Sequence, residues 1–413
     1  MGKTAVMLRT VLLHKVLAMF VVSCTYFPPE KDGKYLVVLS VDGFRHDYPE
    51  MYAVPNLERI SERGVRAEYV SPVFPTFTFP NHYSMVTGMY PDNHGIVMNN
   101  FYCPELDATF RMRDADATTN PDFYGAEPVW VTAELQGITT ATYYWVGSEA
   151  PVNGVMPTYW KEYDASVPFE SRIDSVIAWL SLPFEDRPQL ILFYFNEPDS
   201  QGHLSGPESK ETGYMAEYID SLVGVLETKL ATLPFSENID LIITSDHGMS
   251  KVSHSRYVNL LDHIEWYWFE RFHGSNPVYT ISPRQRFADT LYNSLLHAEN
   301  VSISLNHELP ERLNFGKNPR TLDMTVMADS SWSIGFGEPG TYHTGGAHGY
   351  DNRNSDMHTV FFASGPSFKR GHLHPPFEVI DLYPLIARIL GITPLPSDAC
   401  EKRISGMLKE NGE

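Results

Sequence analysis

Acidic and histidine side chains recur in this chain after short apolar segments. Six such residues stand out, namely Asp42, Asp199, His203, Asp246, His247 and His348. Carboxylate oxygen and imidazole nitrogen are ligands that zinc takes in proteins, and three Asp with three His are enough for two ions. One Asp at a strand end is more often a turn or cap residue, but turn chemistry gives no reason for Asp and His to recur there several times. The pattern predicts metal-assisted chemistry.

A second group of residues offers a nucleophile. Residues 75–82 read Pro-Thr-Phe-Thr-Phe-Pro-Asn-His and precede an apolar periodic segment, and Pro80 is typical of the first residue of a helix. A hydroxyl just ahead of a helix start lies where backbone N–H groups and the helix dipole favour an anion. The local sequence leaves two interpretations open, a Thr that caps the helix and a Thr that attacks a bound anion.

Buried strands and amphipathic helices must position these side chains. Apolar runs of strand length occupy 35–41, 190–195, 239–244 and 359–363. Apolar residues at helical spacing occupy 215–230 and 379–389. Strands that alternate with helices predict an α/β sandwich with a mainly parallel central sheet flanked by helices. In such sheets, functional side chains gather beyond the carboxyl ends of the strands.

The segment 259–336 differs because its apolar runs are shorter and its composition is more polar. We expect a small α+β subdomain there, inserted before the last core strands, with strands near 278–281 and 301–305 around a helix at 288–296. The expected parts of the chain are a signal peptide over 1–23, a tether over 24–33, a catalytic domain over 34–395 and a C-terminal tail over 396–413.

Composition and charge narrow the classes of function. The 413 residues are 43% hydrophobic and 20% charged, which is ordinary globular usage and excludes a disordered chain or a disulfide-rich miniprotein. The 31 Lys and Arg against 51 Asp and Glu leave a net charge of -20, which would repel a nucleic-acid duplex. A small anionic substrate still fits if a metal held by carboxylates reverses the sign of the field in one pocket.

The first residues have the features of an export signal. The first 15 residues contain three basic residues and no acidic one, and an apolar run over 16–22 follows. The sequence Val-Val-Ser-Cys that ends at Cys24 resembles the lipobox of bacterial lipoproteins, which predicts a lipid anchor at Cys24 and a periplasmic or cell-surface location. An ordinary cleavage site with a chance Cys is the alternative. An exported chain would permit a disulfide between Cys103 and Cys400, and their pairing stays open.

Together, these segments resemble the nucleotide pyrophosphatase/phosphodiesterase family of the alkaline phosphatase superfamily. The resemblance runs from about residue 35 to residue 390 and rests on Asp42, the segment 75–83, the Asp199/His203 pair, Asp246-His247-Gly248 and the segment 348–352. It implies an alkaline-phosphatase-like fold and a site with two zinc ions. One ion would be held by Asp199, His203 and His348. The other would be held by Asp42, Asp246, His247 and Thr78.

The same resemblance implies roles in catalysis. Thr78, rather than Thr76, matches the nucleophile because it directly precedes the Phe-Pro-Asn-His-Tyr stretch, and Asn99 matches a residue that steadies a non-bridging phosphate oxygen. Zinc at a Thr hydroxyl makes attack feasible near neutral pH, and a second ion neutralises the leaving oxygen. The implied reaction hydrolyses phosphodiester or pyrophosphate bonds in nucleotides and related diesters through a phospho-threonine intermediate, and it releases a nucleoside monophosphate.

Two aromatic residues are candidates for substrate binding. Phe79 and Tyr163 match family residues that sandwich a nucleobase, although aromatic side chains more often belong to a core. Phe77 departs from nucleotide-hydrolysing relatives, which often carry Lys there. The departure argues against strong binding of extra phosphates and leaves room for less charged diesters.

Other functions stay open. A headgroup phosphodiesterase of phospholipid or choline type would use the same metals and the same Thr. A phosphomonoesterase of this superfamily would carry an Arg clamp and usually a Ser nucleophile, and neither surrounds Thr78. A lipid-anchored binding protein without activity would be favoured by the loss of a metal ligand, but all six predicted ligands are present. The sequence does not indicate an oligomeric state.

The predicted anchor can be tested by changing Cys24 to Ala. The change removes the site of lipid attachment and leaves the core untouched, so the variant should leave the membrane fraction with its specific activity unchanged. Fractionation measures where the variant lies, and mass spectrometry identifies its N-terminus. Recovery of the unaltered protein in solution with the residues before Cys24 still attached would contradict the lipoprotein interpretation.

Overall fold

The computed structural model describes residues 33–410. The predicted signal peptide, Cys24 and the tether up to residue 32 lie outside these residues. Between residues 33 and 410, none of the helices is both long enough and apolar enough to cross a membrane.

An eight-stranded sheet forms the centre of the fold, in the order β19-β2-β18-β9-β1-β8-β6-β7. Its strands are β1 (Tyr35–Val41), β2 (Val65–Ala67), β6 (Thr140–Tyr143), β7 (Tyr159–Lys161), β8 (Leu190–Phe195), β9 (Ile239–Thr244), β18 (Phe361–Ser364) and β19 (His372–His374). β18 runs antiparallel to both of its neighbours, and the other pairs are parallel. The prediction of a mainly parallel sheet is confirmed.

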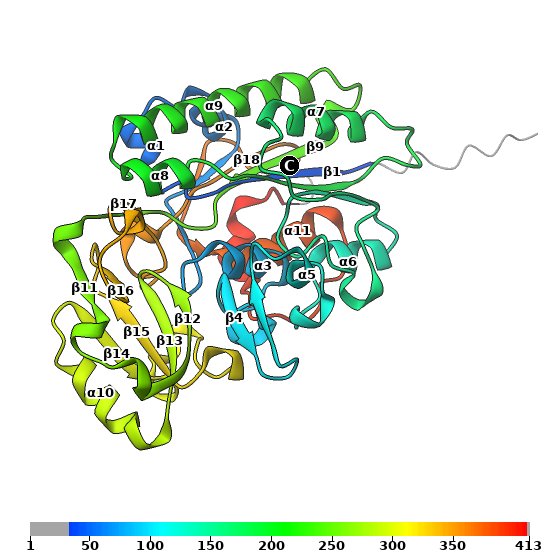
Figure 1. Ribbon diagram of the computed structural model, residues 1–413. Coiled ribbons are helices and arrows are strands. Elements are labelled where there is room, and N and C mark those ends of the chain that lie inside the picture. The colour runs from blue at the N-terminus through cyan, green and yellow to red at the C-terminus, as the bar shows by residue number, and fades with distance from the viewer. Residues whose placement is uncertain (1–32, 411–413) are drawn as a thin grey trace, which may run out of the picture. The chain divides into compact units, whose positions relative to one another are not determined.

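Side chains of the central strand β1 alternate between the two faces of the sheet. Leu36 and Val38 belong to the buried cluster on one face, whereas Val37 and Leu39 belong to the cluster on the other. All seven residues of β1 are buried, because helices cover the sheet on both sides (Figure 1). One layer contains α1 (Tyr48–Met51), α2 (Pro55–Arg63), α7 (Phe169–Leu180), α8 (Asp199–Ser205) and α9 (Lys210–Leu230). The other contains α3 (Thr78–Thr87), α4 (Pro91–His94), α5 (Ala115–Thr118), α6 (Val129–Leu135), α11 (Leu382–Leu390) and α12 (Glu401–Ile404).

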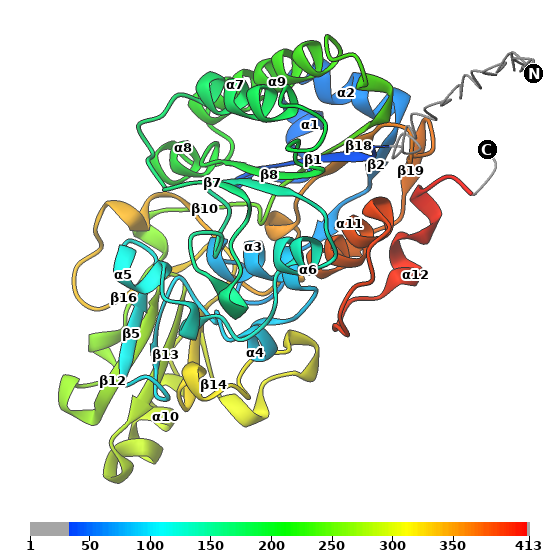
Figure 2. The same cartoon turned by 90° about the vertical axis from the view of Figure 1, so that its right-hand side faces the viewer.

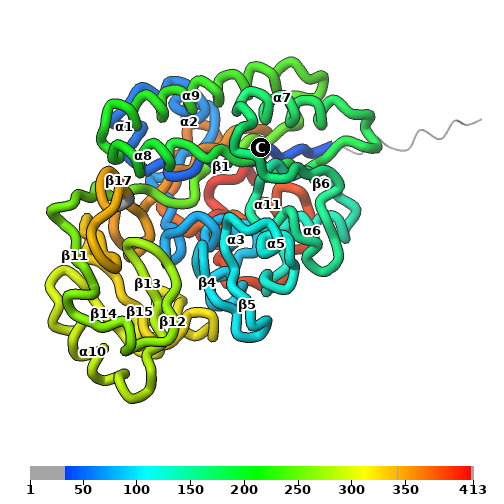
Figure 3. The backbone as a smooth tube through the Cα atoms, viewed as in Figure 1, coloured from blue at the N-terminus to red at the C-terminus, as the bar shows by residue number. Residues whose placement is uncertain are grey.

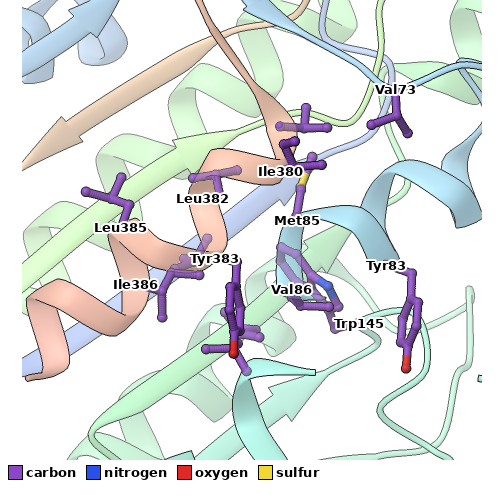
Figure 4. Packing of buried hydrophobic residues seen from close by; sticks show 14 of the residues in the cluster. Val73, Tyr83, Met85, Val86, Trp145, Ile380, Leu382, Tyr383, Leu385 and Ile386 are labelled. Carbon is purple, nitrogen blue, oxygen red and sulfur yellow. The ribbon is translucent and has the colours of Figure 1, made fainter. Parts of the chain in front are cut away.

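Helix α3 is held in place by its packing behind the sheet. Met85 and Val86 of α3 share one buried cluster with Trp145 and with Ile380 and Tyr383 near the start of α11 (Figure 4). Gly88, with φ of 68°, ends the helix in the left-handed conformation that favours glycine. The first turn of α3 therefore has a fixed position relative to the sheet.

The structure starts α3 at Thr78, two residues earlier than the predicted start at Pro80. The first three residues of a helix donate no hydrogen bond within it, so Pro80 fits as the third residue as well as it would fit as the first. Thr78 is therefore the first residue of the helix rather than a residue ahead of it.

The region 259–336 lies below one end of the sheet and contains a four-stranded antiparallel sheet with one helix (Figures 1 and 3). Its main elements are β12 (Phe269–Ser275), β13 (Val278–Pro283), α10 (Ala288–Leu296), β14 (Val301–Leu305) and β15 (Met324–Ala328). Three short strand pairs also lie outside the central sheet: β10 (Ser250–Val252) with β17 (Gly345–Ala347), β11 (Tyr257–Asn259) with β16 (Ser333–Gly335), and β4 (Asn100–Cys103) with β5 (Ala108–Arg111). Another pair joins β3 (Val70–Ser71) to β20 (Phe377–Glu378).

Residues after 395, expected as a tail, pack on the core as far as residue 410 (Figure 2). Ile404 and Met407 are buried in the same cluster as α3 and α11. Asp381 is completely buried, and it accepts hydrogen bonds from the Cys400 backbone N–H and from the Arg403 guanidinium. Cys103 and Cys400 are both free thiols.

Asp220 of α9 stabilises the start of α2, where Val54 offers no side-chain cap. Its buried carboxylate accepts hydrogen bonds from the backbone N–H groups of Leu57, at 2.8 Å, and Asn56, at 3.1 Å. Asp220→Ala should lower the free energy of unfolding by about 2–3 kcal/mol, because these donors lose a charged acceptor. Urea unfolding measures the loss. As a control, Asp174→Ala removes an exposed ion pair with Lys229 and should change stability little, so equal losses in both variants would refute this role of Asp220.

Candidate metal centre

The six predicted metal ligands come together at one edge of the central sheet. Asp42 follows β1, Asp246 and His247 follow β9, and α8, after β8, begins at Asp199. Because β8, β1 and β9 are parallel neighbours, their carboxyl ends deliver these groups to one place. His203 lies one helical turn after Asp199 on α8. His348 does not follow a strand of the central sheet. It follows β17, which pairs with β10 outside that sheet.

Two glycines allow the loops that carry the ligands to approach each other. Gly43 has φ of 71°, and a Cβ there would lie 2.9 Å from the Cα of Asp199. Gly345 has φ of 85°, and a Cβ there would lie 2.2 Å from the carbonyl oxygen of His203. Both positions need a left-handed backbone and a missing side chain, so the ligand spacing depends on glycine at these points.

The ligand atoms form two adjoining groups. In each, the candidate atoms lie within 4.8 Å of one another: Asp42, Asp246 and His247 in the first, and Asp199, His247 and His348 in the second. His203 adjoins the second group, with its Nε2 atom 3.1 Å from Nε2 of His348 and 3.4 Å from Oδ1 of Asp199. All six predicted ligands are thus close together, with His247 at the centre.

The three imidazoles are oriented by the backbone. Nδ1–H donates to a carbonyl oxygen in each, to Gly346 from His203 at 2.9 Å, to Gly248 from His247 at 2.9 Å and to Thr76 from His348 at 2.8 Å. A carbonyl can only accept, so Nδ1 carries the proton and Nε2 presents a lone pair to the cluster. This is the arrangement of histidine ligands in metal sites.

The carboxylates contribute oxygens that lack a hydrogen-bond donor. Within residues 33–410, Oδ1 of Asp42, Oδ1 of Asp199 and Oδ2 of Asp246 are buried without a hydrogen-bond partner. The other oxygens of two of them are held, by the Tyr194 hydroxyl on Asp42 and by the Gly43 N–H, at 3.2 Å, on Asp246. Buried anionic oxygens that face imidazole lone pairs are unfavourable without a cation between them.

The pKa shifts of Asp42 and His348 also indicate that the cluster favours bound positive charge. Burial, and then the charges of Asp246 and Asp199, raise the pKa of the Asp42 carboxyl well above its usual range. Burial, and then His247 and His203, hold the pKa of His348 well below its usual range. Both shifts arise because like groups are crowded in a buried space, and divalent cations would relieve both. The residues present therefore fit metal ions.

The two threonines of the segment 75–82 have different surroundings. Thr78 is partly exposed, and its hydroxyl oxygen lies 3.3 Å from Nε2 of His247. The Thr76 hydroxyl is buried, donates to the Tyr350 carbonyl at 3.1 Å and accepts from the Gly349 N–H at 2.8 Å. The Thr76 side chain therefore supports the loop that follows His348, and only the Thr78 hydroxyl joins the ligand cluster.

Asn99 lies beside the first turn of α3. Its Oδ1 atom accepts a hydrogen bond from the Phe79 backbone N–H at 2.9 Å. Phe79 packs at 5.7 Å, centroid to centroid, from Phe110, whereas Tyr163 is 49% exposed and lies 5.0 Å from the ring of Tyr144. The structure thus brings Asn99 next to the predicted nucleophile, and it leaves about half of Tyr163 exposed.

His82, which was not among the residues predicted for the site, contacts both Thr78 and the predicted metal ligand Asp246. Its Nδ1–H donates to the Thr78 carbonyl at 3.0 Å and lies 3.4 Å from Oδ2 of Asp246. Its Nε2 lies 2.9 Å from the Ser40 hydroxyl, which is placed to donate to it. The spacing of four residues from Thr78, on one face of a helix, was the available signal.

Comparisons with known proteins agree with the site. The family model described as type I phosphodiesterase / nucleotide pyrophosphatase matches residues 36–351. Ectonucleotide pyrophosphatase/phosphodiesterase family member 1 of Homo sapiens is 36% identical over 90% of this chain and 42% of its own length. Venom phosphodiesterase CdcPDE of Crotalus durissus collilineatus is 34% identical over 93% of this chain and 48% of its own length. The chain thus spans less than half the length of these relatives.

Solved structures give the same result. Murine ectonucleotide pyrophosphatase / phosphodiesterase 5 has a TM-score of 0.87 and 32% sequence identity, over 91% of this chain and 100% of the other. An inactive variant of that murine protein, in complex with AMP, has the same TM-score. The resemblance and the fold class inferred from the sequence are confirmed. This chain belongs to the type I phosphodiesterase / nucleotide pyrophosphatase family.

Proposed function

We propose that this protein hydrolyses phosphodiester or pyrophosphate bonds of nucleotides and related diesters and releases a nucleoside monophosphate. The observation that carries the proposal is the Thr78 hydroxyl, 3.3 Å from His247, in a cluster whose three carboxylates each keep one buried oxygen without a hydrogen-bond donor among residues 33–410. The AMP complex of the murine relative supports a nucleotide as the substrate.

The residues that would hold two zinc ions are those of the ligand cluster. Asp199, His203 and His348 would hold one ion, and Asp42, Asp246, His247 and Thr78 would hold the other. Imidazole nitrogen with carboxylate oxygen is a donor set that suits zinc. When bound, the ions supply positive charge that favours ionisation of the Thr78 hydroxyl and stabilises charge on the leaving oxygen.

Side chains of the protein would supply the attacking oxygen and orient the phosphate. Thr78 Oγ1 forms a bond to phosphorus as the bond from phosphorus to the leaving oxygen breaks, which gives a phospho-threonine. Water then attacks that phosphorus, and the Thr78 hydroxyl is regained as the monophosphate leaves. Because the Phe79 N–H holds Oδ1 of Asn99, the amide nitrogen of Asn99 is the atom free to donate to a non-bridging phosphate oxygen.

Substrate preference follows from the aromatic residues. Tyr163 and Phe79 would bind a nucleobase by stacking, which tolerates different bases. Phe77 is only 2% exposed, and its ring lies 5.7 Å from that of His348, so this position offers neither a cation nor an accessible surface to additional phosphates. Diesters with few charges should therefore be preferred to nucleoside triphosphates. Comparison of kcat/KM across dinucleotides, triphosphates and choline-type headgroup esters separates the nucleotide enzyme from a headgroup phosphodiesterase.

Removal of metal tests the ligand assignment. A chelator should abolish turnover of a chromogenic nucleotide ester, and added zinc should restore it and raise the melting temperature by mass action. Asp246→Asn and His348→Ala should lower the zinc content of the purified protein, because each removes a ligand that no neighbour replaces. His297→Ala, which changes an exposed histidine just after α10, is the control. Full activity in the metal-free protein would exclude this mechanism.

Substitution of the two threonines tests the nucleophile. Thr78→Ala should reduce turnover by several orders of magnitude with the melting temperature and zinc content nearly unchanged, and Thr78→Ser should keep part of the rate. Thr76→Ala should instead lower stability by about 1–2 kcal/mol, because the Gly349 N–H loses its buried acceptor. Steady-state kinetics and thermal melts measure both effects. A Thr78→Ala variant with nearly normal kcat would refute the assignment.

A further inference from the structure

Arg172 of α7 is a completely buried arginine with no carboxylate partner among residues 33–410. Its guanidinium donates to the Val167 carbonyl at 3.2 Å, to the Tyr194 carbonyl at 2.9 Å and to Oδ1 of Asn196 at 3.3 Å. Burial of a cation without an ion-pair partner is unfavourable, and burial lowers the pKa of Arg172. A buried charge of this kind is weak evidence for a role in stability, which directs attention to a role in positioning.

Two aromatic rings also contact this cation. The guanidinium carbon of Arg172 lies 4.9 Å from the ring centroid of Tyr144 and 4.8 Å from that of Phe169. A planar guanidinium can interact with ring faces and donate in its own plane at the same time, which an ammonium cannot do. The geometry is therefore specific to arginine.

Tyr144 connects Arg172 to Tyr163, the residue proposed to stack on a nucleobase. Tyr144 is buried, and its ring meets the ring of Tyr163 edge to face, with 5.0 Å between centroids. Arg172 also bonds Val167, which lies in the segment between Tyr163 and the start of α7. The guanidinium thus holds Tyr163 in two ways, through the ring of Tyr144 and through the backbone that follows Tyr163.

We propose that Arg172 is a positioning residue that holds Tyr163 against the organic group of the substrate and so sets a preference for esters that carry a nucleobase. The inference rests on the proposed function, because it assigns a base-stacking role to Tyr163. Arg172 also bonds the carbonyl of Tyr194, whose hydroxyl donates to Asp42, so a role in the metal centre is the competing explanation.

Two esters with the same leaving group separate these explanations. Thymidine 5′-p-nitrophenyl phosphate carries a base, whereas methyl p-nitrophenyl phosphate carries none. Arg172→Lys keeps the charge but loses the planar fork. It should raise KM for the thymidine ester about tenfold, since stacking on one aromatic ring contributes about that factor. Its kcat for both esters and its zinc content should stay within about twofold of the original.

Arg187→Lys is the matched control. Arg187 also stacks on aromatic rings, 3.9 Å from the centroid of Phe235 and 5.5 Å from that of Tyr35, and it also donates to a carbonyl oxygen, that of Leu182. Tyr35 begins β1, at the opposite end of that strand from Asp42. Arg187→Lys should therefore leave KM for both esters unchanged.

A double-mutant cycle connects Arg172 to Tyr163. Tyr163→Ala should raise KM for the thymidine ester, and Arg172→Lys should add little in that background. Equal losses with both esters, no loss with either, or additive effects in the cycle would overturn the proposal. If Arg172→Lys does not fold, Tyr144→Leu must show the same selective rise in KM, and its absence would also overturn the proposal. If the unaltered protein turned over neither ester, the proposed function itself would fail.

Discussion

Three carboxylate oxygens and three imidazole nitrogens meet in a largely buried space at the edge of the central sheet, and no residue of the described range 33–410 places a donor between them. Each imidazole is held by a backbone carbonyl, so none can rotate to relieve the contact with its neighbours. Such an arrangement is stable only with positive charge at its centre. The loops, the glycines at Gly43 and Gly345 and the packing behind them all serve to keep these groups together.

The proposed nucleophile depends on a separate part of the fold. Thr78 begins α3, whose far end packs with α11 in the cluster beneath the sheet, and His82 on the same helix lies beside both Thr78 and Asp246. The helix therefore brings the hydroxyl to the ligands as a rigid unit. Because α3 is anchored by apolar packing remote from the ligands, loss of the hydroxyl alone should leave the position of the metal site unchanged.

Some of this architecture is visible in the sequence. Asp42, Asp246 and His247 follow apolar runs whose strands have the predicted bounds, because parallel strands buried on both faces leave a clear apolar signal. The family resemblance favoured Thr78 over Thr76, but the local residues gave no physical reason for that choice, which lies in contacts with distant segments. The burial of Arg172 could not be predicted from the local sequence either, because it depends on contacts with distant segments. A buried arginine in an amphipathic helix pattern resembles a surface residue until its neighbours are known.

The charge of the chain would give bound metal ions a second role, in substrate binding. A net charge of -20 repels a phosphate diester at long range, and the three carboxylates of the site would add to that repulsion at short range. Two divalent ions would bring four positive charges against those three negative ones and would leave a small positive excess where we propose that the substrate's phosphate binds. Metal loading would then be needed for binding as well as for the chemical step. The aromatic rings would complement this arrangement, because the proposed stacking by Tyr163 would contribute affinity without depending on charge.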